Sequence, residues 1–226
     1  MTTSINENEL VSFLAKCGAL KFGSFVTKSG RVSPYFVNMG TVCDGEGVSL
    51  LASCYAKAFK EHFMNKADNL FGPAYKGIPL CAATSAALYK EHGIKTSFTY
   101  NRKEAKDHGE GGVLVGDTYS EKRQIVIIED VITAGTSIEE TMKIISGIPN
   151  AKLAGLIVAM DRKEKLGDGK SALQQVKEKY KIEAYSIASI DDILKFAPEE
   201  HKESIEKYRS QWGVKSGELK VESGEL

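Results

Sequence analysis

The feature of this sequence that most constrains its fold is an apolar run, QIVII at residues 124–128, that passes directly into acidic and then small residues. A strand that is apolar almost throughout is typical of the centre of a parallel sheet, where helices cover both faces. Similar strand candidates occur at residues 69–71, 95–100, 152–160 and 183–188, and they are separated by helical apolar spacing at residues 48–63, 80–90, 138–145 and 171–179. This alternation predicts an α/β domain with a mainly parallel central sheet flanked by helices.

The rest of the chain predicts one domain with a small addition at its start. A chain of 226 residues is in the range of a single domain, which we expect to span residues 1–213. Residues 1–46 hold one amphipathic helical pattern and then a stretch rich in Gly, Ser and aromatic residues, which indicates a hairpin or small hood. The core is expected at residues 47–213. Residues 214–226 contain SGEL twice and few large apolar groups, so we expect a disordered tail.

Charge and cysteine content exclude several classes of protein. Thirty Lys and Arg balance thirty Asp and Glu, so the formal net charge of zero gives no electrostatic reason to expect binding to nucleic acid or to an anionic membrane. No apolar run approaches the ~18 residues of a membrane span, and the first twenty residues lack a signal-peptide core. The four cysteines, Cys17, Cys43, Cys54 and Cys81, are widely spaced and are expected to be buried reduced thiols. These features predict a cytoplasmic protein.

The segment that leaves the central strand is the strongest candidate for a binding site. Two acids stand at the predicted strand tip and a turn of small and hydroxyl residues follows: Glu129, Asp130, Val131, Ile132, Thr133, Ala134, Gly135, Thr136 and Ser137. Such a turn before a helix offers N–H groups to a phosphate. The carboxylates would repel a phosphate, but they suit sugar hydroxyls or a Mg²⁺ ion. An ordinary capped turn is the alternative, and the pair of acids favours the binding site.

A second candidate phosphate motif does not meet the requirements of a P-loop. Gly169-Lys170-Ser171 follows an apolar strand, as the end of a P-loop would. A P-loop also needs a glycine five positions earlier, where Glu164 stands.

Cationic side chains gather in three other segments. Residues 100–112 contain Arg102, Lys103, Lys106 and His108 before several glycines, and such a mobile loop suits a diphosphate leaving group, although a solvated surface loop is the alternative. Lys76 lies between Gly72 and Gly77, which permit close backbone approach after a strand. In the hood, Lys28 and Phe36 could hold a flat anionic ring, although Phe36 could equally belong to the hood core. Arg162 directly follows a strand, so it should point to the ligand edge.

These residues together carry a family resemblance. IIEDVITAGTS resembles the phosphoribosyl-pyrophosphate signature of type I phosphoribosyltransferases, and KFGSF, TKSGR, SPYF, FGPAYKGIPL, NRKEAKDHGEGG and MDRKE look like the orotate phosphoribosyltransferases. The resemblance implies the type I fold with a small hood. It also implies transfer of the phosphoribosyl group to orotate with Mg²⁺, which gives orotidine 5′-phosphate and pyrophosphate in pyrimidine synthesis, and a homodimer with shared active sites.

The resemblance also implies roles for individual residues. Residues 133–137 would hold the 5-phosphate, and Glu129 and Asp130 the ribose hydroxyls, with Mg²⁺ bound mainly through the substrate near these acids. Tyr75 and Lys76 would contact pyrophosphate, in a turn that often has a non-proline cis peptide in this family. The closing catalytic loop would consist of Arg102, Lys103, Lys106 and His108, and would reach into the neighbouring subunit's site. Lys28, Phe36, Val37, Thr133 and Arg162 would surround orotate and the adjacent diphosphate.

Two positions depart from the family pattern, and two other functions remain open. Glu129 stands where Asp is common, and Val37 where a second aromatic is frequent; neither change removes a needed charge. A regulator that senses phosphoribosyl pyrophosphate on the same fold would not need the catalytic loop. A purine-type transferase would be expected to lack the hood and loop motifs. Both motifs are present, so orotate is the expected substrate.

Overall fold

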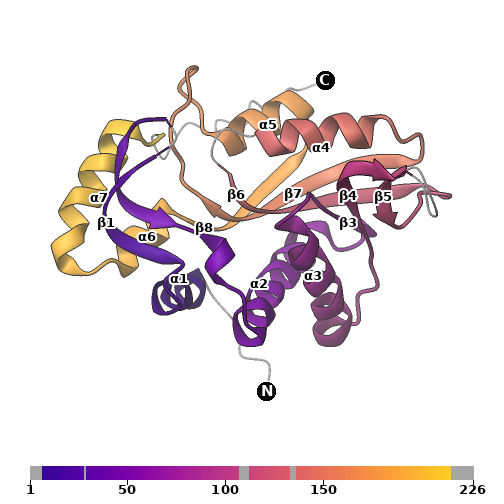
Figure 1. The fold of residues 1–226 in the computed structure, drawn as a ribbon, viewed down its shortest axis with the longest axis horizontal. Coiled ribbons are helices and arrows are strands. Elements are labelled where there is room, and N and C mark those ends of the chain that lie inside the picture. The colour runs from indigo at the N-terminus through magenta and orange to yellow at the C-terminus, as the bar shows by residue number, and fades with distance from the viewer. Residues whose placement is uncertain (1–6, 28, 107–111, 133–135, 215–226) are drawn as a thin grey trace, which may run out of the picture.

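A central sheet between two layers of helices forms the body of the molecule (Figure 1). The structure is a computed structural model that describes residues 7–27, 29–106, 112–132 and 136–214. Within these residues the sheet has the strand order β5-β4-β3-β6-β7-β8. The strands are β3 (Asn69–Gly72), β4 (Ser97–Lys106), β5 (Gly112–Gly116), β6 (Arg123–Ile132), β7 (Ala151–Asp161) and β8 (Glu183–Ser189). β5 is antiparallel to β4, and the neighbouring pairs from β4 to β8 are parallel, so the carboxyl ends of these five strands share one edge.

The central strand β6 joins two hydrophobic layers. On one face of the sheet lie α2 (Gly45–Phe63) and α3 (Gly77–His92), and on the other α4 (Thr136–Ser146) and α5 (Ala172–Tyr180) (Figure 1). Val126 and Ile128 pack into the layer with α2 and α3, whereas Ile125 and Ile127 pack into the layer with α4 and α5. All four side chains are 0% exposed, which confirms the prediction of a central strand covered on both faces.

The hood is a two-stranded hairpin held by helices from both ends of the chain. It consists of β1 (Leu20–Val26) and antiparallel β2 (Val32–Val37), followed by the short 3₁₀ helix η1 (Met39–Thr41). It packs with α1 (Glu7–Lys16) and α7 (Glu199–Trp212), and α6 (Ile190–Phe196) packs against both helices. The buried ring of Tyr35 in β2 meets Tyr208 of α7 edge-on at 6.2 Å. The predicted hood is therefore confirmed.

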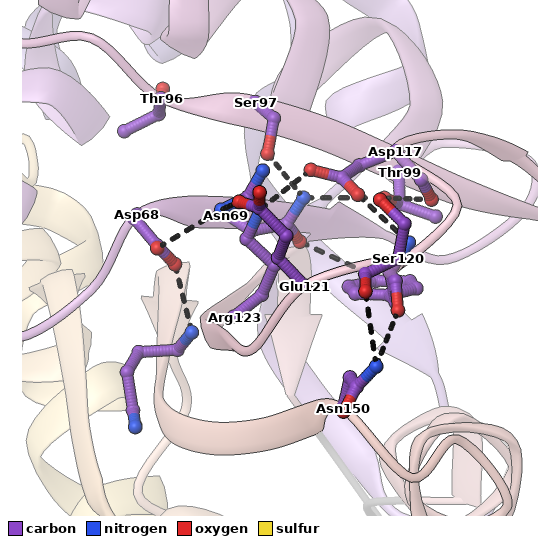
Figure 2. Close-up of polar contacts among 12 residues, drawn as sticks. Asp68, Asn69, Thr96, Ser97, Thr99, Asp117, Ser120, Glu121, Arg123 and Asn150 are labelled. Carbon is purple, nitrogen blue, oxygen red and sulfur yellow. Dashed lines mark hydrogen bonds and ion pairs between the residues drawn. The ribbon is translucent and has the colours of Figure 1, made fainter.

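A polar network ties the amino edge of the sheet together (Figure 2). Buried Asn69 at the start of β3 donates to Thr99 Oγ1 in β4 at 3.2 Å and accepts from the Tyr119 hydroxyl at 3.1 Å. Arg123 Nε at the start of β6 donates to Asp117 Oδ2 at 2.8 Å. These bonds satisfy polar groups that would otherwise be buried without partners.

The structure corrects several element boundaries. β4 continues through Lys106, where a loop was expected from Tyr100, because its charged end pairs with the unpredicted strand β5, Asn101 opposite Leu114. β6 continues to Ile132, beyond the expected strand end at Ile128, so Glu129 and Asp130 lie near the end of the strand rather than just after it. α6 and α7 were not predicted; α7 is largely polar and carries little apolar signal. The four cysteines are free thiols, as predicted, but only Cys54 and Cys81 are buried, whereas Cys17 is half-buried and Cys43 is exposed. Of the tail expected at residues 214–226, residues 215–226 lie outside the described residues.

Candidate active site

Two glycines set the backbone at the carboxyl edge of the sheet. A Cβ atom on Gly72, at the end of β3, would lie 2.2 Å from the carbonyl oxygen of Gly77, the first residue of α3. Neither glycine can accept a side chain without moving the main chain, because each faces backbone atoms of the other. The predicted close approach is therefore confirmed, and it brings the turn at residues 73–76 beside the ends of β4 and β6.

An ion pair joins this turn to the acids of β6. Lys76 Nζ lies 2.7 Å from Asp130 Oδ2, and the Asp130 side chain is 9% exposed against 57% for Lys76. Asp130 Oδ1 also accepts a hydrogen bond from the Val131 N–H at 2.7 Å. The predicted acid and the predicted anion-binding lysine are thus in direct contact in the structure.

The neighbouring acid, Glu129, has a different environment. Burial, followed by repulsion from Asp130, raises the pKa of Glu129 to about 8. Its Oε2 atom is buried without a hydrogen-bond partner among the described residues. The buried hydroxyl of Tyr55, from α2, donates to the Glu129 carbonyl oxygen at 2.6 Å and so fixes the main chain at the strand tip. A buried carboxylate oxygen without a partner is suited to a hydrogen-bond donor or a cation from a ligand.

The turn between β3 and α3 is held from β4. The Ala74 N–H donates to Asn101 Oδ1 at 3.0 Å. The Ala74–Tyr75 peptide bond is cis, as the family resemblance implied, and the Tyr75 side chain is 71% exposed. Tyr75 and Lys76 therefore both face the solvent side of the site.

The cationic segment begins on β4. Arg102 and Lys103 lie in this strand, and Lys103 Nζ is 4.0 Å from Glu140 Oε2 of α4 with both side chains exposed. This pair brings the end of β4 close to the helix that follows the predicted phosphate turn. Several predicted residues lie outside the described part of the chain: Lys28, His108, Thr133, Ala134 and Gly135, together with the side chains of Lys106, Thr136 and Ser137.

The remaining predicted phosphate residues and orotate residues differ in exposure. Ile132 is buried and Val131 half-buried, which leaves their main-chain groups as the source of any ligand contact. In the hood, Phe36 is 43% exposed and packs against Phe25 at 5.5 Å between ring centroids, and Val37 is half-buried beside it.

Arg162 is more enclosed than its position after a strand predicted. Its Nε donates to Glu164 at 2.6 Å and its Nη2 to Ser33 Oγ at 3.0 Å, and its guanidinium lies 4.5 Å from the centroid of the Tyr35 ring. The whole residue is 7% exposed. Arg162 therefore joins the hood to the core at the same edge of the sheet.

Sequence reasoning missed the supporting residues. Tyr55 and Asn101 fix main-chain groups of the site, and Ser33 and Glu164 orient Arg162. The first two leave no sequence signal because they act across elements. Glu164 did leave a sequence signal, because it follows Arg162 by two residues within the MDRKE string.

The described residues contain neither a preformed metal site nor a membrane-spanning helix. No group of three or more His, Cys, Asp or Glu side chains in that part of the chain is arranged to hold a metal ion. Within the same residues, no helix combines the length and apolar character needed to cross a membrane.

A parallel sheet whose carboxyl edge presents paired acids, a lysine and the start of a helix is the site of an α/β enzyme that handles sugar phosphates. Residues 47–198 match the phosphoribosyl transferase domain. Orotate phosphoribosyltransferases of Pseudomonas putida and Clostridium beijerinckii are 43% identical over 213 residues and 40% identical over 220 residues, and each alignment covers 92% of this chain and 98% of the relative. The crystal structure of the orotate phosphoribosyltransferase of Francisella tularensis has a TM-score of 0.79 and 34% identity, and covers 94% of this chain and 98% of that one.

The chain therefore belongs to the phosphoribosyltransferase family, and within it to the orotate phosphoribosyltransferases. The expected type I fold with a small hood is confirmed. The alternatives of a regulator and of a purine-type transferase are set aside, because these relatives are orotate phosphoribosyltransferases and the alignments cover nearly their whole length.

Proposed function

We propose that the carboxyl edge of β3, β6 and β7 is the active site in which this chain transfers the phosphoribosyl group from phosphoribosyl pyrophosphate to orotate. The observation that carries this proposal is the Lys76–Asp130 pair beside Glu129 Oε2, which has no hydrogen-bond partner among the described residues. These groups offer a cation for the diphosphate and acceptors for the ribose hydroxyls at one place. Residues 1–213 would act as one unit, since the hood supplies the orotate end and the core supplies the phosphate end.

The ion pair suggests how the substrate enters. The diphosphate carries more negative charge than one carboxylate, so it would draw the Lys76 ammonium away from Asp130. Asp130 could then accept hydrogen bonds from the ribose hydroxyls together with Glu129. Residues 133–137, at the start of α4, would bind the 5-phosphate through main-chain N–H groups and hydroxyls.

A Mg²⁺ ion fits this site only with help from the substrate. Carboxylate oxygens are the ligands that Mg²⁺ prefers, and Glu129 Oε2 is a buried oxygen without a hydrogen-bond partner in the described residues. The described residues form no metal site of their own, so phosphate and ribose oxygens would supply most ligands, near Glu129 and Asp130. When bound, the ion would neutralise charge on the diphosphate.

Catalysis would rest on stabilising the leaving group. Breaking the bond at C1 of the ribose places negative charge on pyrophosphate, and fixed cations favour that change. Arg102, Lys103, Lys106 and His108 would supply them from a loop that closes over the neighbouring subunit's site in a homodimer. Orotate would lie against Phe36, Val37 and Thr133, with its carboxylate near Arg162 and its ring near Lys28. The enzyme would work in the cytoplasm, without a nucleic-acid or membrane partner.

Orotate consumption tests the proposal. With phosphoribosyl pyrophosphate and Mg²⁺, the chain should consume orotate and release pyrophosphate, and removal of Mg²⁺ with EDTA should stop the reaction. Uracil and hypoxanthine are the control bases and should react far more slowly. Asp130→Asn should lose most of the activity. Absence of orotate turnover, or equal use of hypoxanthine, would overturn the proposed function.

A further inference from the structure

The carboxylate of Glu164 receives hydrogen bonds from three separate elements. Oε1 accepts from Arg162 Nε at 2.6 Å and from the Tyr208 hydroxyl of α7 at 2.9 Å. Oε2 accepts from Arg31 Nη1 of the hood at 3.2 Å. The Glu164 side chain is 14% exposed, so these bonds are made in a largely buried environment.

The main chain around Glu164 is held as firmly as its side chain. Glu164 forms an antiparallel bridge with Gly213, after the end of α7. On either side, the Lys165 N–H donates to the Trp212 carbonyl at 2.7 Å and the Val214 N–H to the Lys163 carbonyl at 2.9 Å. The Arg31 guanidinium also lies 4.4 Å from the centroid of the Trp212 ring. Glu164 is therefore a fixed anion rather than a flexible surface side chain.

This fixed anion determines how Arg162 is oriented. Arg162 Nη2 is bound on the other side by Ser33 Oγ, which itself donates to the Tyr35 carbonyl at 2.7 Å, and the Tyr35 ring covers one face of the guanidinium. A guanidinium has five N–H donors, and these two bonds leave further donors for a ligand. Without the carboxylate, two partly buried guanidinium groups would face each other with no countercharge, and Arg162 would lose its fixed direction.

We propose that Glu164 is a positioning residue for the base-binding end of the site: it holds Arg162 so that its remaining N–H donors meet the carboxylate of orotate. Tyr208 of α7 assists by holding Glu164. The inference rests on the proposed role of Arg162 in binding orotate and extends it to residues that do not themselves touch the substrate. Glu164 should therefore set affinity for orotate and leave the binding of phosphoribosyl pyrophosphate nearly unchanged.

The first experiment compares Michaelis constants. Glu164→Gln keeps the shape of the side chain but removes its charge, and should raise KM for orotate about tenfold or more, as expected when a charge-assisted hydrogen bond weakens. KM for phosphoribosyl pyrophosphate should stay within about twofold. Glu183→Gln is the matched control, because Glu183 bonds to a tyrosine hydroxyl in the same way, at 2.8 Å, at the start of β8. It should leave both constants unchanged.

The second experiment asks whether Glu164 acts through Arg162. In an Arg162→Gln background, adding Glu164→Gln should raise KM for orotate no further, because the oriented group is already absent. Additive effects, or equal rises in both Michaelis constants, would overturn the positioning role. If Arg162→Gln raises KM for orotate and Glu164→Gln does not, the inference is overturned and the role of Arg162 stands. If Arg162→Gln leaves KM for orotate unchanged, the result instead contradicts the proposed function at this end of the site.

A gentler variant covers the case in which Glu164→Gln does not fold. Tyr208→Phe removes one hydrogen bond to Glu164 and keeps the ring that packs against Tyr35. It should raise KM for orotate severalfold with kcat nearly unchanged, while circular dichroism confirms the fold. An unchanged KM for orotate in folded Tyr208→Phe, where Glu164→Gln cannot be measured, would count against the inference.

Discussion

Glu129 and Asp130 are adjacent residues with opposite electrostatic surroundings. Asp130 has the Lys76 ammonium at 2.7 Å, whereas Glu129 has a buried oxygen without a partner in the described residues. Burial and the neighbouring charge of Asp130 raise the pKa of Glu129 to about 8. Near neutral pH the raised pKa favours the protonated form of Glu129 in the free chain, and a cation bound nearby would favour its ionised form, with the proton released to solvent.

The raised pKa of Glu129 predicts how stability depends on pH. Between the ordinary value of 4.5 and about 8, the folded chain keeps a proton that the unfolded chain has lost. Stability contributed by this group is therefore present at low pH and is lost as the pH rises through that window. Glu129→Gln removes the titration. Between pH 5 and pH 8.5 its melting temperature should therefore fall less than that of the wild type, by about 10 °C.

Thermal unfolding monitored by circular dichroism at several pH values measures this difference. Glu140→Gln provides the control, because the Glu140 side chain is 64% exposed. If the melting temperatures of the wild type and Glu129→Gln depend on pH in the same way, the buried carboxylate does not hold a proton.

At the scale of elements, β4 and β5 flank the segment that we propose as the catalytic loop. Lys106 is the last residue of β4, and it pairs with Gly112 at the start of β5. The charge of Lys106 is expected to act mainly in the transition state. Lys106→Ala should lower kcat at least ~100-fold, about 3 kcal/mol, and leave the fold intact.

Steady-state kinetics with a far-ultraviolet spectrum measures this effect. Lys122→Ala is the control, since Lys122 is exposed just before β6 at the opposite edge of the sheet. A kcat within threefold of the wild type would mean that Lys106 is only a solvated lysine.

The amino edge of the sheet should affect stability and not catalysis. Burial acts to raise the pKa of Asp117, but hydrogen bonds from Arg123 and from the Tyr119 N–H outweigh it and hold the pKa below its ordinary value. This stabilisation is present above the ordinary pKa near 3.8 and is lost as the pH falls through the lowered value. Asp117→Asn should lower the free energy of unfolding by about 2 kcal/mol at pH 7 and leave both Michaelis constants unchanged.

Urea denaturation gives this free energy. Glu121→Gln is the matched control, because the Glu121 side chain is 77% exposed at 3.6 Å from the same arginine and should contribute little. If Asp117→Asn and Glu121→Gln lower the free energy of unfolding equally, the polar network (Figure 2) does not stabilise the amino edge of the sheet.

Some elements could be predicted from the sequence and others could not, for physical reasons. QIVII predicted β6 because a strand buried on both faces must be apolar, and EDVITAGTS predicted the site because its residues are contiguous. The end of β4 was missed because its charged residues pair with β5 at the edge of the sheet, where burial leaves no pattern. Tyr55 and Asn101 were missed because each acts across a gap in the sequence on a group that only the fold brings near. Glu164 stands two residues after Arg162, but its bonds to Arg31 and Tyr208 also cross such a gap.

At the scale of the whole molecule, the proposed dimer makes a quantitative prediction. Lys106→Ala and Asp130→Asn subunits should each be nearly inactive alone. If the loop acts on the neighbouring site, one site of every hybrid dimer carries both defects and the other carries neither. Half of randomly paired dimers are hybrids, so about a quarter of wild-type activity should return on mixing.

Mass spectrometry of a tagged pair must first confirm that subunits exchange. The control is a mixture of each variant with itself, which should stay inactive. Confirmed hybrids without recovered activity would mean that the loop serves its own subunit.

The contact of Arg31 with Glu164 and Trp212 has a consequence for the order in which the site can form. The proposed phosphate end is built mainly from the stretch between β3 and the start of α4, with Tyr55 of α2 holding the end of β6. The base end requires the hood, the segment after β7 and the last helix, so it closes only when residues near both ends of the chain have met. Such long-range closure is the slow part of folding. The proposed selection of the base would therefore be established only after α7 has docked against the hood and the segment after β7.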